Sequence, residues 1–320
     1  ENHTRAMHGL SSSFYLAKNA LNMFVDGLRA FVDNPFIKAS EQYEVHLRNF
    51  NSLAQQTEGQ LKLTHDALSN LATDEQLAGM TELAKTLQHI ESSNYHAAEA
   101  MMILESSNKA AMAGLADLFK VADAGTSILM AYGYETSKIN DINNINAKVV
   151  QFGKITMDEL NSTLGTAISI APEAGVAYEQ VAAAIATITA QGVKSAIAST
   201  EVNALMKGVF KPSEQGKELA RSIGLELSAK NLAAKGLYGM MKEIMDKTAQ
   251  FGKDQSGAIA RLLGDIREIR GLMKLATDDG ELYREMLAHM TDDVDQVSLA
   301  LKEQTKTFNY HKKALGDMTE

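Results

Sequence analysis

Residues 153–212 read GKITMDELNSTLGTAISIAPEAGVAYEQVAAAIATITAQGVKSAIASTEVNALMKGVFKP and carry signals for where helices begin and end. Thr156, followed three residues later by Glu159, forms a capping box, which predicts a helix start because each side chain satisfies a free amide of the first turn. Gly192 predicts a helix end, since glycine readily takes the left-handed conformation found there. Pro212 predicts another end, because proline disfavours helical geometry in the preceding residue. The stretch therefore predicts two closely packed helices that meet at Gly192.

The apolar residues of this stretch recur at helical spacing and carry no catalytic motif. Val181, Ile185 and Ile188 share one face of the first predicted helix, with alanines forming a slim surface between them. We therefore predict that the stretch packs against the rest of the chain or against other copies of it. The predicted packing and self-association residues are Val181, Ile185, Ile188, Ile197, Val202, Leu205 and Met206, and the predicted helix stops are Gly192 and Pro212.

The composition extends this expectation to the whole chain. Proline accounts for only three of the 320 residues, whereas alanine and leucine are abundant and 16 residues are methionine. The alternation of apolar and polar residues that is typical of strands is nearly absent. These features favour helix throughout. We predict an all-α fold, a multi-helix bundle of stacked helical hairpins with short connections marked by glycine and proline.

Charge and cysteine content exclude several classes of function. The formal net charge of -9 argues against nucleic acid as a main partner, because phosphate binding needs clustered lysine and arginine. The chain has no cysteine, which excludes disulfides and thiolate metal sites. It also lacks an uncharged apolar run of about 18 residues, so no transmembrane helix is predicted.

Four ranges organise the chain. We predict long amphipathic helices within residues 1–57, among them one over 11–32, and a second helical region over 58–131. A helical core follows over 132–290. The last range, 291–320, is predicted to be a charged helix that leads into the remainder of a longer protein.

Local signals add further detail. Thr73 with Gln76 is another candidate capping box and predicts a helix start. Gly114, Gly125 and Gly133 are predicted breaks between helices.

A helix predicted over residues 137–150 is unusual because its polar faces are rich in asparagine. Asparagine is a poor helix former, so we expect contacts with partner elements to hold this helix in place. The residues concerned are Asn140, Asn143, Asn144 and Asn146.

Two groups of residues contain side chains that bind metals but lack the spacing of a known metal-binding motif. His89 and His96 lie near Glu91 and Glu99, but two helical turns separate the imidazoles and the spacing is not HExxH, so a surface pair is preferred. Residues 278–281 lack the alternating oxygen ligands of a calcium loop and predict an acidic turn instead.

Other motifs also favour a protein without catalysis. Asp292, Asp293 and Asp295 suit a helix N-terminus electrostatically. Gly153-Lys154 lacks the upstream glycine of a phosphate-binding loop, and no GxSxG elbow is present. We predict no catalytic, cofactor-binding or metal-binding residue and therefore no enzyme.

The order of these elements resembles the core of phage tail tape measure proteins, a family also found in prophages. The resemblance is carried by an ordered series rather than by any single motif, and it covers about two thirds of the chain. The matching segments are LAKTLQHIESSNYHAAEAMMILESSNKAAMAGLADL (83–118), YGYETSKINDINNINAKVV (132–150), FGKITMDEL (152–160), APEAGVAYEQVAAAIATITAQGVKSAIASTEVNALMKGVFKPS (171–213) and LLGDIREIRGLMKLATDDG (262–280).

The resemblance implies a structural virion protein that sets tail length during assembly and leaves ahead of the genome at infection. It would be made in the host cytoplasm and lie in the tail tube lumen or at the tail tip. Its implied partners are copies of itself, as a trimer or hexamer around the tail axis, the tail tube protein, distal tail or baseplate hub or tip proteins, a tail assembly chaperone and the host membrane on ejection.

The glycine and proline stops qualify this picture. A fully helical chain of this length would span about 480 Å, at a rise of about 1.5 Å per residue. The stops forbid one continuous helical rod. We therefore expect this chain to be a folded module joined to a longer segment, the ruler, that measures the tail. The alternative from another class is a helical toxin, effector or pore-forming protein that inserts amphipathic helices into membranes, which the acidic charge disfavours.

Overall fold

The protein is described by a computed structural model, which covers residues 35–74, 79–264 and 266–317. These residues form helices joined by short connections, and no strand occurs among them. The all-α expectation is therefore confirmed. The helix predicted over residues 11–32 lies outside the described residues.

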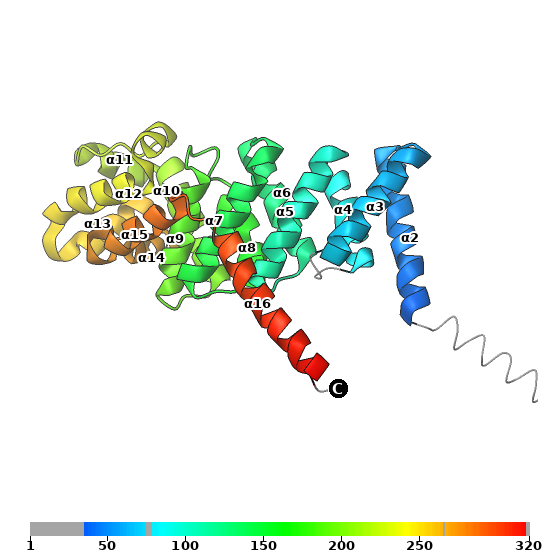
Figure 1. Cartoon of the computed structure of the whole chain (residues 1–320). Helices are drawn as coiled ribbons and strands as arrows, with labels where there is room; N and C mark the ends of the chain where they lie inside the picture. Colours follow the sequence, from blue (N-terminus) through cyan, green and yellow to red (C-terminus); the bar gives the residue numbers. More distant parts are fainter. Residues whose placement is uncertain (1–34, 75–78, 265, 318–320) are drawn as a thin grey trace, which may run out of the picture.

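Most helices stand side by side in two layers (Figure 1). One layer is formed by α4 (Met80–Ser92), α6 (Leu118–Tyr132), α8 (Met157–Ile168), α10 (Ser195–Phe210) and α14 (Ile266–Leu275). The other is formed by α5 (Ala98–Gly114), α7 (Ile139–Gly153), α9 (Tyr178–Ala190) and α15 (Glu281–Thr291). From α4 to α10 each helix contacts the helix two places further along the chain, which is the arrangement of stacked helical hairpins.

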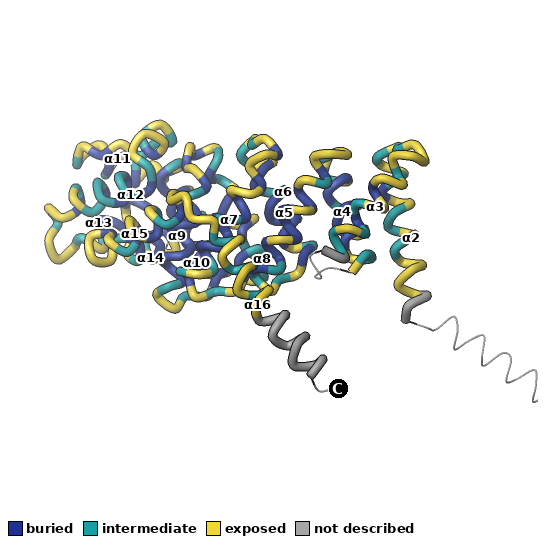
Figure 2. Tube along the Cα trace, in the orientation of Figure 1, coloured by how far each residue is buried: buried dark blue, intermediate teal, exposed yellow. Residues whose placement is uncertain are grey.

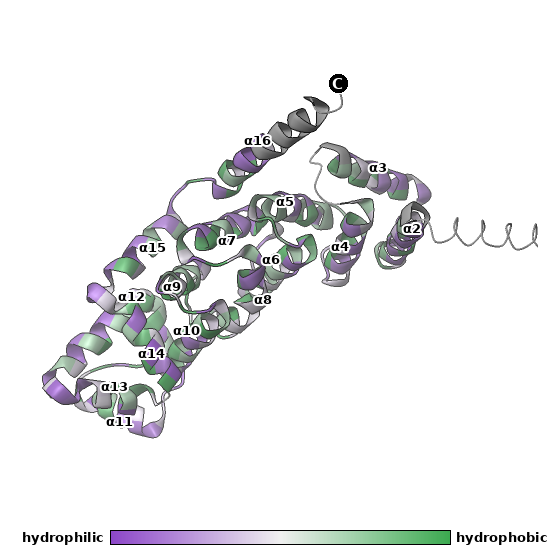
Figure 3. Cartoon of the chain, turned by 90° about the horizontal axis from the view of Figure 1, so that it is seen from below, coloured by the Kyte–Doolittle hydropathy of each residue, from purple (hydrophilic) through white to green (hydrophobic). Residues whose placement is uncertain are grey.

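Further helices complete the two ends of the stack. At one end, α2 (Pro35–Ala54) contacts α4, and α3 (Glu58–Asp74) lies beside it. The other end holds α11 (Glu214–Ser222), α12 (Ala229–Thr248) and α13 (Gln255–Leu263), with short 3-10 helices at Ala249–Asp254 (η2) and Thr277–Gly280 (η3). A third 3-10 helix, η1 (Thr136–Lys138), joins α6 to α7. The last helix, α16 (Gln296–Asp317), contacts α5 and α7 and then leaves the stack (Figures 1 and 3).

The stretch 153–212 contains three helices rather than two. The capping box is present, with Thr156 and Glu159 bonded in both directions at the start of α8. That helix ends at Ile168, and α9 begins only at Tyr178. Between them, Pro172 has no amide hydrogen to donate and Gly175 has a φ of +71°. A Cβ at Gly175 would lie 2.5 Å from the Cβ of Ala233, so glycine also lets this connection approach α12.

Two other sequence predictions are wrong, each for a local reason. Gly125 does not break a helix but lies inside α6, where a Cβ would come within 2.6 Å of the Ile139 Cδ1 atom. It permits close approach of α6 and α7 instead. Thr73 is no N-cap, because it lies in the last turn of α3, and Gln76 falls outside the described residues.

Glycine with positive φ does end helices elsewhere. Gly133 caps the C-terminus of α6 with a φ of +63°, as predicted, and the acidic turn predicted at 278–281 coincides with η3 and the start of α15. The sequence interpretation missed the end of α13 at Gly264, which has a φ of +96°.

The core runs continuously through the stack, from Phe50 to Met290 (Figure 2). Helix α9 lies at its centre, and every residue from Val181 to Thr189 is buried. Because α9 packs against α7, α10 and α15, it holds the two layers together.

Candidate functional site

The predicted packing residues lie mostly inside the chain. Val181, Ile185 and Ile188 on α9 are completely buried, and Val202, Leu205 and Met206 on α10 are buried as well. They therefore form part of this chain's own core. Ile197, at the start of α10, is 49% exposed and is the one member of the predicted set that another copy could reach. Self-association through these residues stays a prediction.

Both predicted helix stops lie where α9 and α10 end. Helix α9 ends at Ala190, and Gly192 follows with a φ of +86°. Helix α10 ends at Phe210, two residues before Pro212. The connection at Gly192 returns the chain from one layer to the other.

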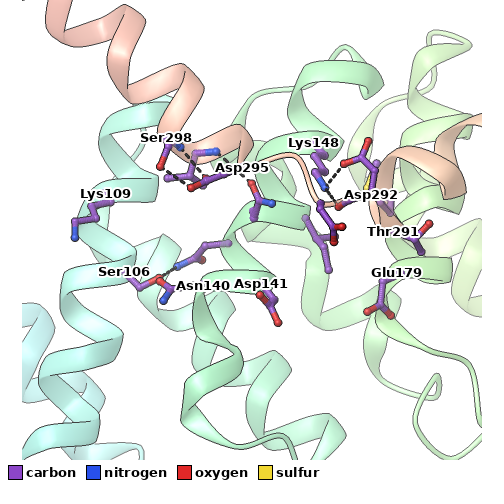
Figure 4. A pocket seen from close by; sticks show the side chains of 16 residues that line it. Ser106, Lys109, Asn140, Asp141, Lys148, Glu179, Thr291, Asp292, Asp295 and Ser298 are labelled. Carbon is purple, nitrogen blue, oxygen red and sulfur yellow. Dashed lines mark hydrogen bonds and ion pairs between the residues drawn. The ribbon is translucent and has the colours of Figure 1, made fainter.

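A polar groove lies between α5, α7 and the segment that joins α15 to α16 (Figure 4). Its volume is about 660 Å³. Carboxylates outnumber cations along its wall. The titratable residues that line it are Asp141, Glu179, Asp292, Asp293, Asp295, Lys109 and Lys148.

Lys148 lines this groove beside Asp292 (Figure 4). Its side chain is only 3% exposed, and its Nζ donates to the backbone oxygen and to Oδ1 of Asp292, both at 2.7 Å. The bond from this ammonium lowers the pKa of the Asp292 carboxyl, and the amide of Val294, which also donates to Oδ1, lowers it further. A buried lysine is tolerated here because its charge is paired and hydrogen-bonded.

Asn144, one helical turn before Lys148 on α7, holds the start of α16. Its Oδ1 accepts from the amides of Gln296 at 2.6 Å and Val297 at 3.2 Å, and its Nδ2 donates to the Val294 oxygen at 2.7 Å. Free amides at a helix N-terminus need such acceptors. Asn144 therefore caps α16 from a different helix.

The other asparagines of α7 show why this helix tolerates them. Asn143 donates to the Ser106 hydroxyl on α5 at 2.9 Å, and Asn146 accepts a short hydrogen bond from the Tyr178 hydroxyl on α9. Both asparagines are buried. The expectation that partner contacts hold this helix is confirmed for these two residues and for Asn144, while Asn140 is exposed.

The aspartates predicted to cap a helix have different roles. Asp295 accepts from the amide and the hydroxyl of Ser298, at 2.9 and 2.6 Å, and so caps α16 as expected. Asp292 pairs with Lys148 instead, a contact between residues 144 positions apart. Asp293 is exposed at the groove.

His89 and His96 do not pair with each other, and each contacts a different carboxylate. The Nε2 atom of His89 lies 2.9 Å from Asp123 Oδ1, and the Nδ1 atom of His96 lies 2.7 Å from Glu91 Oε1. Within the described ranges, no three histidine or acidic side chains are grouped so that they could hold a metal ion.

The groove is lined by polar and charged side chains, among them the hydroxyl groups of Ser106 and Ser298. The Ser298 hydroxyl donates to the Asp295 carboxylate as part of the helix cap, and the Ser106 hydroxyl accepts from Asn143. No helix among the described residues is both long and apolar enough to cross a membrane.

Comparison with known proteins identifies the family. The family described as phage-related minor tail protein matches residues 65–264, which run from α3 to the end of α13 and make up more than half of the chain. No curated protein and no solved structure gives a significant match. The matched range contains α7 but ends before the segment that binds to it at the groove. The chain therefore belongs to the phage-related minor tail protein family.

Proposed function

We propose that this chain is a folded segment of a tail tape measure protein, which sets tail length during assembly and leaves the tail ahead of the genome. The observation that carries the proposal is a stack built only of helices, within the described residues, in a chain of a tail protein family. The backbone hydrogen bonds of a helix lie within that helix, so helices can be separated from one another without breaking hydrogen bonds between elements, as a sheet cannot. Inside a tube, short helices would need new packing partners to stay folded, because isolated short helices are marginal in water.

The proposal gives this segment a structural role, without catalysis, in the tail tube lumen or at the tail tip. Copies of the chain would associate as a trimer or hexamer around the tail axis, and exposed Ile197 is available for such contacts. The tail tube protein, distal tail, baseplate hub or tip proteins and an assembly chaperone would be its neighbours during assembly, with the host membrane a further one on ejection. We propose that the folded stack is a module attached to the ruler, because its chain reverses direction at each connection.

The test is to remove the protein during assembly and to image the resulting tails by electron microscopy. If it is the ruler, tails are missing or have no defined length. A minor tail protein with another role would leave tubes of the normal length, and that result would refute the proposal. Mass spectrometry of intact particles and of particles after ejection provides the second measurement. The protein should be present before ejection and depleted afterwards.

A further inference from the structure

We propose that Asn144 and Lys148 form a latch that holds α16 on the stack, and that α16 separates from an intact stack when this latch opens. The two residues lie four positions apart on α7 and so share one face of that helix. Together they engage Asp292, Val294 and the first two amides of α16. Figure 4 shows the pair of Lys148 with Asp292.

Burial of apolar surface contributes little to the docking of α16. No side chain from Thr291 to Lys306, the last one described, is buried. Leu299 and Val294 are 53% and 45% exposed, and Val297 is the member of this segment that packs against the core. Hydrophobic stabilisation scales with the apolar area removed from water. The polar contacts of Asn144 and Lys148 therefore hold the start of α16 in place, while the helix also contacts α5.

The latch is specific because one of its charges is buried. Lys148 is almost inaccessible in the docked arrangement, and removing a partner from a buried charge is costly. This favours one position of the segment 292–297 over nearby alternatives. The orientation of α16 relative to the stack follows from that position.

The surroundings also allow the latch to open. Lys148 lines a groove of about 660 Å³, whose wall carries Asp141 and Glu179 in addition to Asp292. When α16 departs, water can reach the ammonium, and Asp141 and Glu179 remain in the groove wall. The charge is therefore not left in an apolar environment, and the core, which ends at Met290, is not cut.

The absence of cysteine makes a distance measurement direct. Two cysteines introduced at the exposed positions Lys207 on α10 and Lys302 on α16 would be the only sites for spin labels. The test variant is the double substitution Asn144→Leu and Lys148→Met, which keeps side-chain size but removes the polar contacts. The matched control is Asn140→Leu with Lys138→Met, on the exposed end of the same α7 region.

The latch variant should show a broad distribution of label distances, whereas the wild type and the control show a narrow one. Amide exchange in α16 should accelerate by about tenfold or more, as expected for the loss of one or two hydrogen bonds, while α9 stays protected. A narrow distribution in the latch variant would overturn the proposal. So would a parallel loss of protection in α9, because the two residues would then be supporting the core rather than holding α16.

Discussion

Replacing Gly271 with alanine tests whether α10 and α14 pack as closely as described. Gly271 lies in the middle of α14, and a Cβ there would come within 2.8 Å of the Glu201 backbone oxygen on α10. Alanine is favoured over glycine inside a helix by about 1 kcal/mol. The contact with rigid backbone opposes this, because overpacking costs about 1–3 kcal/mol. We therefore expect Gly271→Ala to change the free energy of unfolding by about 0–2 kcal/mol in the destabilising direction.

Gly165 on α8 provides the matched control. It is exposed, has helical geometry, and a Cβ added there would meet nothing within 4 Å. Gly165→Ala should therefore stabilise the protein by up to about 1 kcal/mol. Urea unfolding followed by far-ultraviolet circular dichroism measures both variants. If Gly271→Ala stabilises the protein as much as Gly165→Ala, the reasoning about the α10–α14 contact is refuted.

Three further predictions follow from the core, the groove and the proposed function. Ile185→Ala should lower the free energy of unfolding by about 2–5 kcal/mol, because the Ile185 side chain is completely buried. Ile197→Ala should change it by less than about 0.5 kcal/mol, because Ile197 is 49% exposed. Urea unfolding measures both variants. Because the pKa of Asp292 is lowered in the folded protein, its contribution to the docking of α16 is fully present above the ordinary pKa of 3.8 and is lost as the pH falls through the lower folded value. Amide exchange of α16 should therefore accelerate only at acidic pH. The substitution Asp292→Asn should weaken this pH dependence. Inserting about 44 helix-forming residues after Lys306 should lengthen tails by about 66 Å if α16 enters the ruler, while the same insertion after Gly224 should leave the length seen by electron microscopy unchanged.

Signals that act within a few residues could be predicted from the sequence. The capping box at Thr156, the ends marked by Gly192 and Pro212 and the left-handed Gly133 all depend on local backbone geometry. The asparagine content of α7 also predicted partner contacts, because asparagine has a low helix propensity and the helix needs such contacts to be stable. It could not predict which partners those would be.

Features that depend on distant contacts could not be predicted in this way. Gly125 looks like a break in the sequence, yet it accommodates Ile139 of the next helix. The connection at Gly175 depends on Ala233, and the groove depends on Lys148 reaching Asp292 across 144 positions. In each case the deciding interaction joins residues whose proximity only the folded chain establishes.

The order of contacts along the stack gives the molecule different mechanical properties at its two ends. At the α2 end, α2 contacts principally α4, so tension applied there would peel helices away in sequence, one neighbour at a time. At the C-terminal side of the chain, α16 lies on α5 and α7, so tension on it loads its contacts with α5 together with the Lys148–Asp292 pair and the cap at Asn144. A force applied at α2 is therefore expected to unfold the chain in several small steps, whereas a force applied at α16 must break one group of contacts together.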